Sequence, residues 1–268
     1  MKKFLLFAAM AACSLGISAQ EVQSTTQDAS ADTWLRKGNT AKHGSDKVLE
    51  IYSFKSDTES AEFELDFVGV MAFDVPSAPD EDWVMQSATL RLVTERAKGN
   101  LVIYPFVSFG EDNIYADLAD EVAAARQQTP IVESFKLAGQ NGKAVTDNGV
   151  TMNTVAEWTN TLDLTAYLKS GEINELSMLL VNPANTKTSV KVYTREATDV
   201  ELKDGTIFAA KDLVPQLTVV YEKPLADGVQ TLTLQSTGRG EVYTLGGQRM
   251  AQPTKGIYVV NGKKIVIK

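Results

Sequence analysis

The chain has 268 residues, of which 26 are basic and 34 are acidic, and its net charge is −8. An acidic chain repels nucleic acid at long range, so we exclude that class of partner. The chain has one cysteine and one histidine. We therefore expect no zinc site, and any Ser-His-Asp arrangement would have to use His43.

Residues 1–19 have the pattern of a secretory signal peptide. Lys2 and Lys3 precede an apolar run at 4–12, and small residues lead to Ala19. The apolar run is too short to span a membrane. The alternative is a lipoprotein signal in which Cys13 is lipidated. Either signal exports the chain, so we expect it to be secreted or held on the outer cell surface.

The next residues, 20–31, are polar and predict a flexible leader. From Asp32 onward, short runs in which apolar residues recur at alternate positions are separated by turns rich in Gly, Pro, Asn and Asp. These patterns predict an all-β fold, an antiparallel β-sandwich of the jelly-roll kind over 32–222. The expected strands lie at 48–54, 62–75, 87–95, 101–109, 175–183, 189–196 and 215–222.

Two segments of the sandwich domain predict helix. Residues 111–128 place Ile114, Leu118 and Val122 four apart, which predicts a helical insertion of three to four turns. Residues 162–171 predict a short helix that ends at Gly171. An insertion at one end of a sandwich either shapes a binding surface or decorates the fold.

The strand pattern breaks at 222–228, where we place the domain boundary, and short strands return in the segment 223–268. The dipeptide Asn261-Gly262 predicts a two-residue hairpin turn between the last two strands. The stretch "VYTLGGQRM…KGIYVVNGKKIVIK" resembles the C-terminal sorting segments of Bacteroidetes proteins that use the type IX secretion system. The resemblance implies that outer-membrane secretion machinery is a partner of this segment. The alternative is an ordinary hairpin docked on the main domain.

No motif for nucleotide binding or nucleophilic catalysis occurs in the chain. Glycosidase chemistry needs only two carboxylates, and the number of acidic residues leaves that alternative open. We expect no enzyme activity and no organic cofactor.

Three segments of the sandwich domain together resemble the DNRLRE family of secreted β-sandwich domains, which includes carbohydrate-binding modules. The shared phrases, in order, are Asp32 to Arg36, "HGS" (43–45), "MAFD" (71–74), "SATLRL" (87–92), "TREA" (194–197) and "PQLTV" (215–219). His43 stands where the family favours Tyr, and the helical insertion is atypical. The resemblance implies a non-catalytic module for polysaccharide or another glycan.

Candidate glycan-binding residues surround the first of these phrases. Trp34 lies beside Arg36 and Lys37, and an aromatic ring flanked by cations suits an acidic sugar. The alternative is that Trp34 packs into the sandwich. Trp158 either caps the sandwich or forms a second sugar platform. Arg195 either clamps a ligand or makes a cross-strand ion pair.

Asp32 and Glu196 are the candidate metal ligands, for one structural calcium ion. The alternatives are a turn-forming role for Asp32 and an ion pair for Glu196. The leading hypothesis for function is an exported glycan-binding module. The second hypothesis is a structural or adhesive surface protein that binds other proteins.

Overall fold

The computed structural model describes eleven stretches of the chain in two compact units, Glu21–Glu222 and 223–268. The division follows Glu222, where the sequence pattern breaks. The signal peptide expected at 1–19 and the turn expected at 261–262 lie outside the described residues. The described residues are 20–55, 64–97, 99–138, 155–171, 173–183, 189–201, 205–224, 242–245, 247–250, 253–260 and 263–267.

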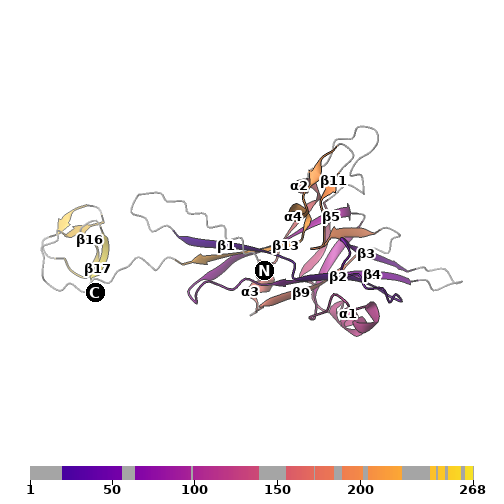
Figure 1. Cartoon of the computed structure of the whole chain (residues 1–268). Coiled ribbons are helices and arrows are strands. Elements are labelled where there is room, and N and C mark those ends of the chain that lie inside the picture. The colour runs from indigo at the N-terminus through magenta and orange to yellow at the C-terminus, as the bar shows by residue number, and fades with distance from the viewer. Residues whose placement is uncertain are drawn as a thin grey trace. The chain divides into compact units, whose positions relative to one another are not determined.

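Strands dominate the first unit, where a sheet of 11 strands curls into the two layers of a β-sandwich (Figure 1). One layer holds β1 (Glu21–Asp28), β13 (Gln216–Lys223), β5 (Val84–Ala97) and β8 (Thr159–Asp163). The other holds β2 (Ala31–Arg36), β3 (Val48–Lys55), β4 (Glu64–Asp74), β9 (Glu175–Val181), β6 (Asn100–Pro105) and β7 (Val132–Lys136). The strand β10 (Val190–Tyr193) pairs antiparallel with both β3 and β5 and joins the layers. The predicted all-β antiparallel fold is confirmed.

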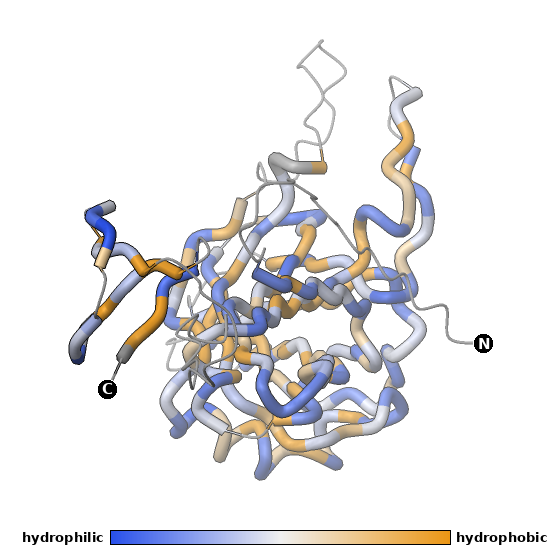
Figure 2. Tube along the Cα trace, turned by 90° about the vertical axis from the view of Figure 1, so that its left-hand side faces the viewer, coloured by the Kyte–Doolittle hydropathy of each residue, from blue (hydrophilic) through white to orange (hydrophobic). Residues whose placement is uncertain are grey.

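The main core lies between the two layers. Phe73 of β4, Leu90 and Leu92 of β5 and Met178 of β9 are fully buried there. The alternation of apolar and polar residues along the strands is visible in Figure 2. The expected inward face of β5, with Ala88, Leu90 and Leu92, is confirmed, because an antiparallel strand with one covered face buries every second side chain.

The strand β4 is buried on both faces, because the helix α1 (Ala119–Ala125) covers its outer side (Figure 1). Val68 and Val70 of β4 lie in a second apolar cluster with Leu118 and Val122. Burial of this cluster supplies most of the free energy that holds so short a helix in place.

The helical insertion is shorter than the three to four turns predicted for 111–128. The 3-10 turn η1 (Tyr115–Asp117) precedes α1, and Asn113 and Asp117 accept hydrogen bonds from the backbone amides of Gly110 and Ile114. Such local side-chain acceptors compete with helix formation. At the other end, Pro130 disfavours helical backbone at the residue before it.

A buried carboxylate ties this insertion to the sheet. Asp66 of β4 is 3% exposed, and its Oδ1 lies 2.6 Å from Nη2 of Arg126. The hydroxyl of Tyr115 donates to Oδ2 of Asp66 at 2.9 Å. Burial, together with the nearby negative charge of Asp66, raises the pKa of Tyr115 above its usual range.

The leader expected to be flexible at 20–31 instead contains β1, which pairs with β13, and the start of β2. Thr26 and Thr218 share a hydrogen bond of 2.8 Å, and Nε2 of Gln216 donates to Asp28. β1 contains β-branched residues but buries little surface, so it lacks the apolar alternation on which the prediction relied. The prediction of a flexible leader is therefore wrong for these residues.

A third apolar cluster lies on the outer face of β5. It is built by two short helices and a two-stranded ribbon: α2 (Val155–Trp158), α4 (Ala210–Leu213), β11 (Val200–Glu201) and β12 (Ile207–Phe208). The helix α3 (Thr165–Lys169) forms within the stretch 162–171 where a short helix is predicted.

The second unit is a small antiparallel sheet in the order β15 (Arg249–Met250), β14 (Val242–Thr244), β16 (Gly256–Val260) and β17 (Lys263–Ile267). Val260 pairs with Lys263, which leaves the two residues of the expected turn between the strands. Tyr258 and Ile265 are the buried side chains that we find in the described part of this unit.

Candidate functional site

Trp34 lies in the main core, where it is 9% exposed and two other rings stack on it. His43 stacks on it with ring centroids 3.5 Å apart, and Phe67 stacks at 5.5 Å. The indole Nε1 donates to Oδ2 of Asp46 at 2.8 Å, and Nδ1 of His43 lies 2.9 Å from the same oxygen. The structure therefore favours the packing role of Trp34 over a sugar platform, and it gives the single histidine a structural role.

The two cations beside Trp34 are exposed but already engaged. The guanidinium of Arg36 lies 4.9 Å from the ring centroid of Phe67. Lys37 forms an ion pair of 2.6 Å with Glu64, and this hydrogen bond lowers the pKa of Glu64. These cations do not converge on an open aromatic face.

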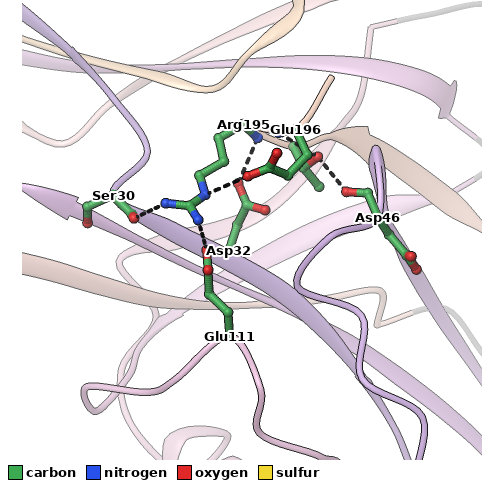
Figure 3. Close-up of polar contacts among 7 residues, drawn as sticks. Ser30, Asp32, Asp46, Glu111, Arg195 and Glu196 are labelled. Atoms are coloured by element: carbon green, nitrogen blue, oxygen red, sulfur yellow. Dashed lines mark hydrogen bonds and ion pairs between the residues drawn. The ribbon is translucent and has the colours of Figure 1, made fainter. Parts of the chain in front are cut away.

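Arg195 is the centre of a polar cluster that ties the start of β2 to two loops (Figure 3). Its guanidinium donates to the carbonyl of Ser30 and lies 2.6 Å from Glu111 and 3.2 Å from Glu196. Its backbone amide donates to Oδ2 of Asp32 at 2.8 Å. All these contacts are within the protein, so the structure favours a role for Arg195 in holding the sandwich together.

Asp32 is fully buried beside this cluster, and its Oδ1 has no hydrogen-bond partner among the described residues. Burial raises the pKa of Asp32 to about 6, although the amide and the charge of Arg195 act in the opposite direction. The described stretches contain no group of three or more acidic, His or Cys side chains that could hold a metal ion. Asp32 and Glu196 are the predicted calcium ligands. In the structure the positive charge beside both of them is the guanidinium of Arg195.

A pocket of about 120 Å³ opens on the outer face of β5, within the third apolar cluster. Its inner wall is formed by residues that are buried, namely Val93, Thr94, Trp158 and Leu213. Half-buried Tyr193 and Phe208 continue the wall toward solvent, and exposed Glu95 lies at the opening. Val155 and Val200 complete the lining.

Two polar groups of this pocket remain free to bind a ligand. The carboxylate of Glu95 makes no ion pair or hydrogen bond with any residue that the structure describes, and the same holds for the hydroxyl of Tyr193. Burial raises the pKa of Tyr193 to about 12, and the charge of Glu95 adds to the shift. The single proton of the Thr94 hydroxyl is already used, because it is shared between the carbonyls of Ala138 and Trp158.

Of the residues predicted from the sequence, only Trp158 lines this pocket. Trp34 belongs to the main core, and Arg36, Lys37 and Arg195 make the contacts described above. Sequence reasoning missed Tyr193, Phe208 and Glu95. Tyr193 directly precedes the "TREA" phrase, but no sequence signal places Phe208 next to it.

Comparison with protein-family models and with curated proteins found no match to this chain. Among the described residues, no helix is long and apolar enough to cross a membrane.

Proposed function

We propose that this protein is an exported, non-catalytic module that binds a polysaccharide or another glycan at the pocket on the outer face of β5. The observation that carries the proposal is the lining of that pocket. Trp158, Tyr193 and Phe208 give it three aromatic side chains, and Glu95 gives it a free carboxylate. Aromatic rings bind the apolar faces of sugars, and a carboxylate accepts hydrogen bonds from sugar hydroxyls.

The polar clusters elsewhere in the sandwich support binding rather than catalysis. The carboxylates of Glu111 and Glu196 face a guanidinium that pairs with both. His43 is held by Asp46 and Trp34. A binding module needs shape and a few polar contacts, and it needs no activated acid or base.

The small C-terminal unit fits a separate role in export and attachment. Its exposed surface includes the basic residues Arg249, Lys255, Lys263 and Lys264. In this proposal the outer-membrane secretion machinery binds the unit, and the sandwich then reaches the cell surface. Removal of residues 223–268 in the producing cell should leave the sandwich inside the outer membrane, as measured by fractionation.

A glycan array probed with the mature chain tests the binding function. We expect a restricted set of glycans to bind, and Phe208→Ala to weaken binding about tenfold because an aromatic contact is lost. Glu95→Gln should weaken it several-fold, because a hydrogen bond to a charged group is stronger than one to an amide.

Phe109→Ala is the matched control, because Phe109 is a half-buried phenylalanine that packs against the helical insertion instead of the pocket. It should leave binding unchanged. Absence of binding to every glycan, with capture of a protein partner by the same surface, would overturn the proposal in favour of adhesion.

A further inference from the structure

The size of the pocket limits what enters it. Its volume is about 120 Å³. An apolar protein cavity of about 150 Å³ holds one benzene molecule, and pockets for whole drug-sized ligands occupy about 300–1,000 Å³. A pyranose ring with its hydroxyl groups is larger than benzene, so the cavity admits a substituent of a sugar and not the ring itself.

The polarity of the pocket sets the orientation of that substituent. Val93 and Leu213 are apolar and buried, and the buried indole of Trp158 is apolar apart from its single N–H. The proton of the one inner hydroxyl, on Thr94, is engaged by two carbonyls. Most of this inner wall offers no partner to replace the hydrogen bonds to water that a polar group would lose there. The innermost atoms of the ligand are therefore apolar.

The free polar groups lie nearer solvent than this wall. Glu95 is exposed and accepts hydrogen bonds, and the hydroxyl of half-buried Tyr193 donates or accepts one. A substituent that suits the site has an apolar tip and, directly behind it, one donor and one acceptor.

Resting on the proposed glycan-binding function, we propose that the pocket selects N-acetylated amino sugars by admitting the acetamido group. The methyl group contacts the apolar inner wall. The amide N–H donates to the carboxylate of Glu95, and the amide carbonyl accepts from the hydroxyl of Tyr193. The sugar ring stays outside, where the edge of Phe208 contacts it. A free ammonium group at the same position would also pair with Glu95, but it would leave the apolar inner wall of the pocket without a contact.

The test is calorimetric titration of the mature chain with three oligosaccharides of equal length, built from glucose, glucosamine or N-acetylglucosamine. We expect the N-acetylated oligomer to bind about tenfold more tightly than the glucose oligomer, from burial of the methyl group and two added hydrogen bonds. Tyr193→Phe should reduce that preference several-fold without changing the affinity for the glucose oligomer.

A variant that fills the cavity tests whether the preference for the N-acetylated oligomer arises in the pocket. Val200→Phe adds a ring on the lining strand β11 and should abolish the preference. Ile207→Phe is the matched control, because Ile207 lies on the paired strand β12 and is 61% exposed. If Val200→Phe does not fold, titration of the wild-type chain with the three oligosaccharides still tests the inference.

Equal affinity for the glucose and N-acetylglucosamine oligomers, or tightest binding of the glucosamine oligomer, would overturn this inference. A glycan from the array that binds at the pocket but carries no acetamido group would do the same and leave the proposed function standing. If no glycan binds, the proposed function fails and the inference fails with it.

Discussion

Asp32→Asn should stabilise the sandwich progressively as the pH rises from 4 to 7.5. The asparagine side chain has the same shape, and its carbonyl still accepts the hydrogen bond from the backbone amide of Arg195. What it removes is a charge that the wild-type protein must bury at neutral pH, since Asp32 is fully buried.

The magnitude follows from the pKa of Asp32, which burial raises from 3.8 to about 6. Each pKa unit corresponds to about 1.4 kcal/mol, so ionised Asp32 costs the folded state about 3 kcal/mol. A carboxyl whose pKa is raised by folding stabilises the protein below its unfolded pKa, and this contribution is lost as the pH rises through the folded value. The difference in free energy of unfolding, variant minus wild type, should therefore grow by about 2.5 kcal/mol between pH 4 and 7.5, because the carboxyl of the unfolded chain is already partly ionised at pH 4.

The assay is urea unfolding of both proteins at pH 4, 5, 6 and 7.5, followed by tryptophan fluorescence. All three tryptophans, Trp34, Trp83 and Trp158, lie in the sandwich unit, so the signal reports that unit alone. Asp163→Asn is a control of opposite sign, because hydrogen bonds from Thr165 lower the pKa of the exposed Asp163. A difference that stays constant with pH, or one that shrinks as the pH rises, would refute the claim that burial outweighs the charge of Arg195 at Asp32.

Three further substitutions test the packing, each by chemical denaturation. Phe73→Ala empties a fully buried site between the layers and should cost about 3–5 kcal/mol; a loss below 1 kcal/mol would place this side chain outside the core. Arg126→Met leaves Asp66 buried without its cation and should cost about 3 kcal/mol, part of which Asp66→Asn should restore in the double variant; no restoration would contradict the pairing. Gly44→Ala would place a Cβ atom 2.6 Å from Cβ of Glu111 and should cost about 1–3 kcal/mol, whereas a neutral effect would show that this loop gives way freely.

The sequence predicted the strands that bury one face, because their alternation follows directly from the pleat. Leu90 and Leu92 of β5 are examples. It did not predict β1, whose polar residues pair with β13 at the edge of the sheet. It also missed that β4 is covered on both faces, since Val68 and Val70 continue the apolar pattern without marking what packs on them.

The candidate site was less accessible to sequence reasoning than the fold. The phrase around Trp34, Arg36 and Lys37 has a composition that suits a sugar, but local composition does not reveal that His43 and Phe67 cover the ring. The pocket brings Glu95 together with Tyr193 and Phe208, which are about a hundred residues away along the chain. Only the pairing of β5 with β10, and of β11 with β12, places them on one wall.

The most direct test of the central claim is the location of the bound ligand. Nuclear magnetic resonance of the isotope-labelled mature chain, titrated with an N-acetylglucosamine oligomer, should show the largest shift changes around Trp158, Tyr193 and Phe208. The indole signal of Trp34 should stay in place. Changes confined to Arg36 and Lys37, with the pocket signals unmoved at saturation, would contradict the assignment of binding to the pocket.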